Sequence, residues 1–341
     1  MSQHHVLVTG GSGFIGGHVV LAALAAGHRV RTTIRSLDRE PAVRAALEAA
    51  GMLDGDRLGF AAADLTDDAG WDAAMDGIDR VIHVASPVAP GHVEDEATII
   101  DPARDGATRV LRAAHRAGVQ RAVLTSAFHA VAWGHPHDEH VFTEADWTVL
   151  DGPGTDAYGR SKTLAERAAW DVAEETGLKL TTLLPVAVVG PLITPSISGA
   201  NQLLQRLLTG AMPGLLNLYL PLVDVRDIAS AHVAALDADR AAGRRLLLGS
   251  DQALPLSRIA AALRDGLGED AASVPTNEIP DAAIRAQAES NPELRGTVDD
   301  LGYARRFSTA AAQEVLGFSP RPSLEAAVDA ARSMVWFGLT R

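Results

Sequence analysis

The chain of 341 residues contains no cysteine. Disulfide bonds, thiolate catalysis and cysteine-ligated zinc are therefore excluded as explanations of its fold or activity. Basic residues are also scarce, because 30 lysines and arginines face 43 acidic residues and leave a net charge of −13. This balance argues against a broad nucleic-acid surface and against docking on an anionic membrane. It does not exclude one small basic pocket for a phosphorylated ligand.

Long uninterrupted apolar runs are absent as well. Residues 6–26 are largely apolar, but the preceding MSQHH carries no lysine or arginine and glycines interrupt the run, so no signal peptide is expected. The segment 178–193, LKLTTLLPVAVVGPLI, contains Lys179, two threonines and two prolines, which is unlike a membrane-spanning helix. With 47% apolar and 21% charged residues, the composition is that of a soluble globular protein. We expect a cytoplasmic protein without a membrane partner.

The first 190 residues alternate short apolar, β-branched segments with longer alanine-rich helical stretches. The strand-like HHVLVT at 4–9, for example, is followed by a helical stretch at 14–27 and by the strand-like HRVRTTIR at 28–35. Strands that are apolar nearly throughout and alternate with helices predict a parallel sheet covered on both faces. We therefore predict an α/β protein with a doubly wound parallel sheet.

This rhythm breaks after Pro191, where a stretch rich in leucine, proline and glycine begins. Short amphipathic helices are expected after about residue 255. We predict a sheet domain over 1–190 with a returning segment at 223–249, and a smaller, discontinuous lobe formed by 191–222 and 250–341. Ligands of open α/β sheets bind at the carboxyl edge, where the strand order reverses, so the lobe is expected to cover a substrate there.

The stretch VTGGSGFIGG directly follows the first predicted strand and opens the first helix. It places Gly10, Gly13 and Gly16 at a spacing of three, where the backbone must turn tightly and touch a ligand. The helix N-terminus then offers unpaired N–H groups and a positive dipole to a pyrophosphate. A plain glycine-rich turn would not need this strand-before, helix-after context. We predict that Gly10, Gly13, Phe14, Ile15 and Gly16 bind a dinucleotide.

The end of the second predicted strand indicates which dinucleotide binds. An acidic residue there would hold a ribose hydroxyl of NAD, but the sequence TTIRSLDRE has Arg35 at that place and Arg39 close behind. Arginine makes bidentate contacts with phosphate oxygens, which suits the extra phosphate of NADP. Asp38 favours the opposite interpretation, since it could turn towards a ribose. NADP(H) is the predicted cofactor, with Asp64 and Leu65 bordering its adenine, although Asp64 would also suit a helix N-cap.

A third set of residues points to proton transfer. One predicted strand ends at Ser126, and YGRSK at 158–162 places Tyr158 and Lys162 one helical turn apart on the same face. A neighbouring cation lowers the pKa of a phenol, and a general acid works best when its pKa approaches the working pH. We predict that Ser126 hydrogen-bonds a carbonyl, Tyr158 donates the proton, and Lys162 lowers the pKa of Tyr158 and binds the nicotinamide ribose. Taken singly, each has an ordinary interpretation: a strand-end serine, a half-buried tyrosine, a surface lysine.

These motifs resemble those of the extended short-chain dehydrogenase/reductase superfamily: TGGSGFIG, Asp64-Leu65, VIHVASP at 81–87, LTSA and YGRSK. Arg35 and the segments LLPVAVVGP, VDVRDIASAHVAAL and LGFSPRPSLEAAV are similar to its dihydroflavonol reductase-like branch, which includes cinnamoyl-CoA reductases and microbial NADPH-dependent aldehyde and ketone reductases. The resemblance covers nearly the whole chain and implies a Rossmann fold, NADPH, and a catalytic triad of the serine, tyrosine and lysine just described. It also implies further cofactor contacts at Val84, Ala85, Ser86, Pro185 and Val188.

One departure from this branch bears on the substrate. Plant members usually carry Ser-Ala-Gly from the catalytic position, whereas this chain has Ser126-Ala127-Phe128-His129. Bulk at this point should shape the pocket, so the match is closer to the microbial carbonyl reductases than to enzymes of plant flavonoids. The predicted substrate contacts are Phe128, His129, Trp133 and residues 191–222. A core position for Phe128 and a structural role for His129 remain open.

The predicted function is NADPH-dependent reduction of an aldehyde or ketone, apolar or aromatic because residues 196–222 carry few charges. A nucleotide-sugar epimerase or dehydratase is one alternative, although such dehydratases typically carry Asp-Glu soon after the catalytic serine. A non-catalytic NADP-sensing protein is another, although a sensor would not need the triad. The histidines of HPHDEH at 135–140 lie in a polar, proline-containing loop, and no metal is expected there. We expect a small-molecule partner, no nucleic acid, and a monomer or a homodimer joined through helices near 94–117 and 158–176.

Overall fold

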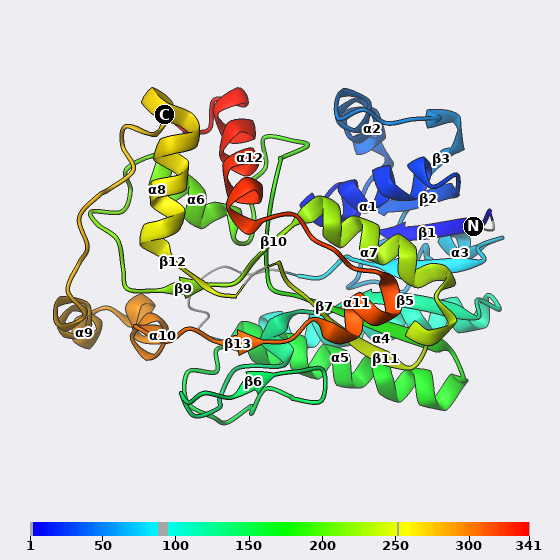
Figure 1. Ribbon diagram of the computed structural model, residues 1–341. Coiled ribbons are helices and arrows are strands. Elements are labelled where there is room, and N and C mark those ends of the chain that lie inside the picture. The colour runs from blue at the N-terminus through cyan, green and yellow to red at the C-terminus, as the bar shows by residue number, and fades with distance from the viewer. Residues whose placement is uncertain (1–2, 88–94, 251, 341) are drawn as a thin grey trace.

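The computed structural model describes residues 3–87, 95–250 and 252–340. Its main sheet consists of parallel strands in the order β11-β7-β5-β4-β1-β2-β3 (Figure 1). The strands are β1 (His5–Thr9), β2 (Arg29–Ile34), β3 (Leu58–Ala62), β4 (Arg80–His83), β5 (Arg121–Thr125), β7 (Lys179–Pro185) and β11 (Arg244–Leu248). The chain builds outwards from β1 through β2 to β3 and then crosses to β4 on the other side of β1. The predicted doubly wound sheet is confirmed, and its switch point lies between β1 and β4.

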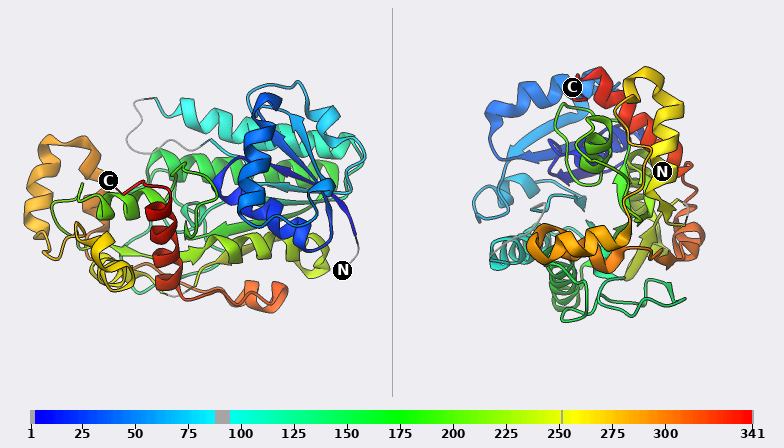
Figure 2. Two further views of the ribbon diagram at one scale, coloured as in Figure 1. Left: turned by 90° about the horizontal axis from the view of Figure 1, so that it is seen from above. Right: turned by 90° about the vertical axis from the view of Figure 1, so that its left-hand side faces the viewer.

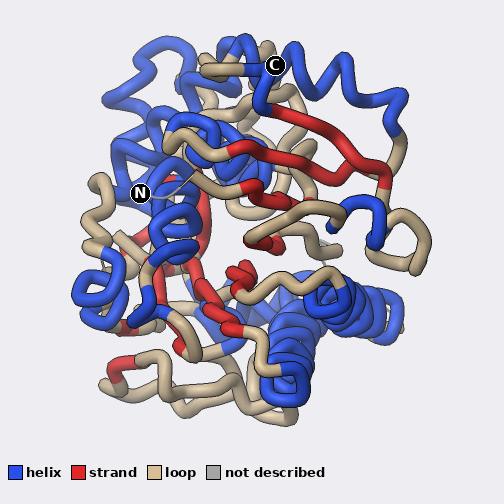
Figure 3. The backbone as a smooth tube through the Cα atoms, turned by 90° about the vertical axis from the view of Figure 1, so that its right-hand side faces the viewer, coloured by secondary structure: helices blue, strands red, loops and turns tan. Residues whose placement is uncertain are grey.

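Helices cover both faces of this sheet, as Figures 1 and 3 show. One face carries α1 (Phe14–Ala25), α2 (Glu40–Ala49), α7 (Val225–Asp237) and α11 (Ala310–Leu316), and the other carries α3 (Trp71–Met75), α4 (Ala97–Arg116) and α5 (Ala157–Thr176). Strand β1 shows why both faces are covered. Val6 and Val8 pack in the core beneath α1 and α7, whereas Leu7 packs in the core with α3, α4 and α5. Successive side chains of a strand point to opposite faces, so an apolar strand needs a helical layer on each side.

Helices that lie beyond the carboxyl edge of the sheet (Figure 2) enclose a separate hydrophobic core. It is formed mainly by α6 (Asn201–Leu208), α8 (Leu256–Leu267) and α12 (Ser323–Trp336). The strand pair of β8 (Ala187–Val189) with β10 (Leu222–Asp224) joins it to the sheet domain, whereas the pair of β9 (Tyr219–Leu220) with β12 (Leu254–Pro255) lies within the lobe. The helices α9 (Asp281–Ser290) and α10 (Pro292–Asp300) lie at its far end. This second core supports our proposed division into a sheet domain and a smaller discontinuous lobe.

The segment around residues 306–318 packs with the sheet domain instead of the lobe. Its strand β13 (Arg306–Phe307) pairs with β6 (Val141–Phe142), and Phe307, Ala312 and Phe318 join the core under α7. The remaining elements are short 3-10 turns: η1 (Leu37–Arg39), η2 (Gly55–Arg57), η3 (Phe128–Ala130), η4 (Asp239–Ala241) and η5 (Gly268–Ala271). Across the part of the chain that the structure describes, no helix combines the length and apolarity needed to cross a bilayer.

Candidate active site

The glycine turn leads from β1 into α1 at the carboxyl edge of the sheet. Gly10 has a φ of +74°, a conformation that favours glycine, and Gly13 is the N-cap of α1. A Cβ on Gly16 would lie 2.2 Å from the carbonyl oxygen of Gly10, so only glycine lets the turn fold this closely against the helix. The predicted context is therefore present, with the N–H groups of the first turn of α1 available to an anion.

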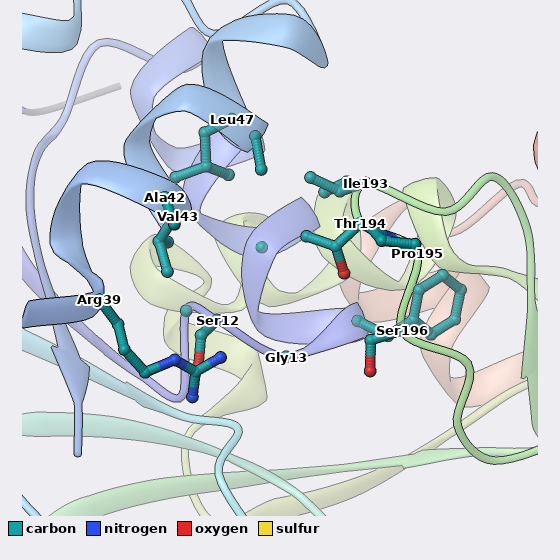
Figure 4. Close-up of a pocket in the computed structure, with 14 residues that line it drawn as sticks. Ser12, Gly13, Arg39, Ala42, Val43, Leu47, Ile193, Thr194, Pro195 and Ser196 are labelled. Atoms are coloured by element: carbon teal, nitrogen blue, oxygen red, sulfur yellow. The ribbon is translucent and has the colours of Figure 1, made fainter. Parts of the chain in front are cut away.

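A pocket of about 310 Å³ opens beside this turn (Figure 4). Its apolar wall comes from α2 and from the segment after β8, and Arg39, Ser12 and Ser196 provide polar groups. Among the predicted cofactor residues, Gly13, Phe14 and Arg39 line the pocket, whereas Arg35, Asp64 and Leu65 do not. The pocket therefore combines a helix N-terminus, one arginine and an apolar wall, which suits a nucleotide. Four further residues of its wall, Ile193, Thr194, Pro195 and Ser196, belong to the segment 191–222, which was predicted to contact the substrate and not the cofactor.

The charged residues after β2 differ in whether they already have partners. Arg35 and Arg39 are exposed, and neither guanidinium forms an ion pair or hydrogen bond with another described residue. Asp38 accepts a hydrogen bond from the Ser36 hydroxyl at 3.0 Å within its own turn. The two arginines are therefore available to a phosphate, whereas Asp38 has a local partner.

Asp64 closes a turn after β3. Its Oδ1 accepts hydrogen bonds from the N–H and the hydroxyl of Thr66, at 2.9 and 2.8 Å, and these bonds hold the pKa of the carboxyl below its usual range. The N-cap of the next helix, α3, is Gly70, so Asp64 is not the helix cap that its sequence context also allowed. The contact of Asp64 and Leu65 with an adenine stays a prediction.

Thr9, which the sequence analysis did not single out, organises the loop after β4. Its Oγ1 accepts hydrogen bonds from the N–H groups of Val84 and Ala85, each at 3.0 Å, and lies 2.8 Å from Nδ1 of His83. Burial lowers the pKa of His83 to about 3, so its ring is neutral and Nδ1 can accept the hydroxyl proton. A polar residue that ends an otherwise apolar strand was the available signal.

The other predicted cofactor contacts also lie at this end of the sheet. Ser86 follows the loop held by Thr9, and its hydroxyl donates to the carbonyl of Pro87 at 3.4 Å. Pro185 ends β7, and Val188 pairs with Val223 of β10. Since β4, β7 and the glycine turn meet along the same edge, one extended ligand can reach all three.

Tyr158 and Lys162 lie together on the first turns of α5. The helix begins at Asp156, whose Oδ1 accepts a hydrogen bond from the N–H of Gly159 at 2.7 Å. Arg160 binds Glu96 with two contacts of 2.7 Å, which ties the start of α5 to that of α4. The Lys162 Nζ lies 5.7 Å from the centroid of the Tyr158 ring, and this ammonium has no hydrogen bond or ion pair with any described residue.

The pKa of Tyr158 departs from the prediction. Burial, aided by the Asp156 carboxylate, raises the pKa of Tyr158 to about 12, which is opposite in direction to the lowering that Lys162 was expected to cause. The Lys162 ammonium lies over the face of the ring, 5.7 Å from its centroid, and desolvation of the buried phenolate is the main cause of the raised pKa. The same burial lowers the pKa of Lys162 to about 8 against the opposing attraction of Glu166. Tyr158 is therefore protonated at neutral pH, the state needed for a proton donor.

Ser126 faces a buried carboxylate. Its hydroxyl donates a hydrogen bond of 2.7 Å to Oε2 of Glu166, whereas the preceding Thr125 bonds His232 of α7 at 2.7 Å. This follows from strand alternation, which turns neighbouring side chains to opposite faces. Glu166 lies eight residues after Tyr158 on α5, roughly 12 Å along the helix. The structure thus brings Tyr158 and Lys162 together and directs the Ser126 hydroxyl to Glu166, and the predicted role of Ser126 remains untested.

The predicted substrate contacts separate into core and pocket residues. Phe128 is 1% exposed and packs against Phe142 and Phe307 with ring centroids 6.1 and 5.5 Å away, so its prediction as a substrate contact is corrected to a core residue. His129 and Trp133 are partly exposed, and their rings stack at 3.6 Å. The His129 ring also meets the Tyr158 ring edge-on, with centroids 4.9 Å apart. Phe128 is the first residue of η3, and its buried ring packs edge-on against the Trp133 ring with centroids 5.7 Å apart.

The histidine-rich loop at 135–140 has partners of its own. His135 Nε2 bonds the carbonyl of Trp147 at 3.0 Å, and His140 Nε2 lies 3.1 Å from Asp146. Within 3–87, 95–250 and 252–340, no group of three histidine, aspartate or glutamate side chains is arranged to hold a metal ion.

Comparison with known proteins gives consistent matches. Residues 6–249 match the NAD dependent epimerase/dehydratase family. Cinnamoyl-CoA reductase 1 of Arabidopsis thaliana is 39% identical over 248 residues, which cover 72% of this chain and 70% of that protein. An anthocyanidin reductase ((2S)-flavan-3-ol-forming) of Vitis vinifera is 33% identical over 263 residues, covering 73% of this chain and 77% of that protein. The crystal structure of yeast methylglyoxal/isovaleraldehyde reductase Gre2 complexed with NADPH has the same fold, with a TM-score of 0.79 and 23% identity over 99% of this chain and 100% of that one.

Proposed function

The chain belongs to the NAD dependent epimerase/dehydratase family, and from this premise we propose that it reduces an aldehyde or ketone to the alcohol with NADPH. It is an oxidoreductase of the short-chain dehydrogenase/reductase type, as the sequence resemblance implied and as its reductase relatives support. The observation that carries the proposal is the pairing of a protonated Tyr158 with Lys162 at the sheet edge that also holds the glycine turn. The names of these relatives favour a reductase over a nucleotide-sugar epimerase.

The residues present fit NADPH. The glycine turn is too tight for a Cβ at Gly16, the N-terminus of α1 faces a pocket, and Arg39 lines that pocket without an ion-pair partner among the described residues. The turn from Gly10 to Gly16 would hold the pyrophosphate, and Arg35 and Arg39 the additional phosphate. Val84, Ala85, Ser86, Pro185 and Val188 would border the nicotinamide end, and Lys162 would bind its ribose. When bound, the cofactor supplies a hydride.

The chain's own residues then manage the substrate and the proton. Tyr158 donates its phenolic proton to the carbonyl oxygen as the carbon receives the hydride, because a phenol with a pKa of about 12 is protonated at neutral pH. Lys162, whose pKa is about 8, stabilises the resulting tyrosinate and returns a proton to it. Trp133 and His129 offer stacked aromatic surface beside the phenol, which suits an apolar or aromatic substrate. The lobe segment 191–222 would close the pocket over it.

The test is NADPH oxidation with a panel of aldehydes, ketones and ketoesters, run beside NADH and beside Tyr158→Phe. The proposal expects turnover that favours NADPH and falls by about 10²-fold or more in the phenylalanine variant, with NADPH binding unchanged. Tight NADPH binding without turnover of any carbonyl would contradict it. That outcome would favour the alternatives, a nucleotide-sugar enzyme or an NADP sensor, and conversion of a nucleotide sugar would distinguish these two.

A further inference from the structure

We propose that His129, and not Ser126, is the side chain that hydrogen-bonds the substrate carbonyl beside Tyr158. The inference rests on the proposed carbonyl reduction and assigns its second hydrogen-bond donor. It starts from the partners of these two side chains, which differ in the structure: the serine hydroxyl already has an acceptor, and the imidazole has none.

The Ser126 hydroxyl is committed to a buried network. It has one proton to donate, and it donates it to Oε2 of Glu166 at 2.7 Å. The same carboxylate accepts from Thr182 at 2.7 Å and from Arg245 at 2.8 Å, and the side chain of Glu166 is fully buried. Turning Ser126 towards a substrate would remove a hydrogen bond from a buried carboxylate, which is costly. Ser126 therefore acts as a support for Glu166.

The His129 side chain, unlike that of Ser126, has no hydrogen-bond partner among the described residues. Its ring is fixed between Trp133, stacked at 3.6 Å, and the edge of Tyr158 at 4.9 Å. Neither ring nitrogen has a hydrogen-bond partner among the described residues, and because His129 is partly exposed its ring can be reached by a ligand. An imidazole that is held rigidly beside the proton donor and lacks a protein partner is suited to bind a polar atom of the substrate.

The surroundings of His129 keep it neutral. Burial is the main cause that lowers its pKa to about 3, and the cation of Arg305 lowers the pKa further, against the opposing attraction of Asp300. Arg305 donates hydrogen bonds to the Ala132 carbonyl at 3.2 Å and to Asp300 at 2.7 Å, and its guanidinium stacks on the Trp133 ring at 4.2 Å. A neutral imidazole carries one N–H donor, which is sufficient for one carbonyl oxygen.

The proposed step is balanced as follows. With NADPH bound, the carbonyl carbon would receive a hydride from the cofactor, the C=O π pair would move to oxygen, and Tyr158 would donate its proton to that oxygen. The carbonyl would thereby be reduced at the expense of NADPH, while His129 keeps its proton throughout. Its N–H hydrogen bond strengthens as negative charge develops on the oxygen, which lowers the barrier without a proton transfer of its own.

The experiment compares His129→Phe, His129→Gln and Ser126→Ala with the wild-type protein in kcat, NADPH affinity and thermal unfolding. Phenylalanine keeps the stacking and removes the donor, and glutamine restores a donor without the ring. We expect His129→Phe to lower kcat by about 10²-fold with unchanged NADPH affinity, and His129→Gln to recover part of that loss. Ser126→Ala should lower kcat less than about tenfold and lower the unfolding temperature, because it removes a buried hydrogen bond.

The inference is overturned if Ser126→Ala loses at least as much kcat as His129→Phe, or if His129→Phe retains kcat within about threefold of wild type. A glutamine variant no better than the phenylalanine variant would also overturn it, since the role would then be one of shape. These results are distinct from failure of the proposed function. A wild-type protein that reduces no carbonyl, or a Tyr158→Phe variant with full activity, overturns the reductase proposal and this inference with it.

Discussion

The guanidinium Nε of Arg245 lies 2.8 Å from Oε1 of Glu166, and the two side chains are 9% and 0% exposed. Arg245 also stacks on Trp147 at 3.5 Å. The carboxylate accepts hydrogen bonds from Ser126 after β5 and from Thr182 on β7. One buried ion pair therefore joins α5, which carries Tyr158 and Lys162, to three neighbouring strands of the sheet.

Replacing Glu166 by glutamine should destabilise the protein strongly. The variant leaves the charge of Arg245 buried without a counterion, and breaking a buried pair costs about 3–5 kcal/mol. The free energy of unfolding in urea is the measurement. The control is Glu314→Gln, which breaks an ion pair with Arg240 in which both side chains are exposed, and should cost less than about 1 kcal/mol. Equal losses in the two variants would contradict the prediction.

Removing either arginine near the cofactor pocket should weaken the binding of NADPH selectively. A charge-assisted hydrogen bond contributes about 1.5–3 kcal/mol, so Arg39→Gln should raise the Kd for NADPH at least about tenfold and change that for NADH much less. Arg35→Gln should have the same direction of effect. Arg240→Gln, in the turn before β11 at the amino end of the sheet, is the control. An arginine variant that weakens NADH binding as much as NADPH binding would show that the guanidinium does not bind the extra phosphate.

Lys162→Met should make the protein more stable at neutral pH while abolishing its turnover. Burial lowers the pKa of Lys162 from 10.5 to about 8, so the charged native form carries a desolvation cost below pH 8. Between these two values the unfolded chain binds more protons than the native one, and stability rises with pH. The gain in unfolding temperature should therefore be present at pH 7 and shrink as the pH rises through 8 towards 10.5. A gain that is independent of pH would argue against this cause.

Acid should weaken the protein partly through His232. Its Nδ1 lies 2.7 Å from the carbonyl of Ile228 and therefore donates, so Nε2 accepts from the Thr125 hydroxyl. Burial lowers the pKa of His232 from 6.5 to about 4, so the unfolded chain binds more protons in that window and stability falls as the pH drops. One such histidine contributes up to about 1.4 kcal/mol per pH unit. Urea unfolding at several pH values should show a shallower acid slope for His232→Gln, and an unchanged slope would contradict the assignment.

Alanine at Gly16 should disrupt the glycine turn. The new Cβ would lie 2.2 Å from the carbonyl oxygen of Gly10, which is backbone and can move only with the turn. We expect NADPH affinity to fall by at least about tenfold, since the displaced N–H groups of α1 would lose their hydrogen bonds to the pyrophosphate. Gly59→Ala in β3 is the matched control, because a Cβ there would meet no atom within 4 Å. Wild-type affinity in the Gly16 variant would show that the turn is not the phosphate site.

The sequence by itself determined the features that depend on local spacing. Alternating apolar strands and helices were sufficient for the doubly wound sheet, because such strands must be covered on both faces. The glycines follow directly on a strand and open a helix, so the turn was recognisable from neighbours alone. Tyr158 and Lys162 are four residues apart, and helical geometry places them on one face in any fold.

Only the tertiary structure decided contacts that join distant segments. The Ser126 hydroxyl bonds Glu166 because α5 packs against the end of β5 in one particular position along its axis. No pattern within either segment determines that position. The packing of Phe128 against Phe307, and the closeness of His129 to Tyr158, each depend on parts of the chain far apart in sequence. The pKa of Tyr158 was misjudged for the same reason, because charge proximity can be read from spacing, whereas burial is a property of the whole packed site.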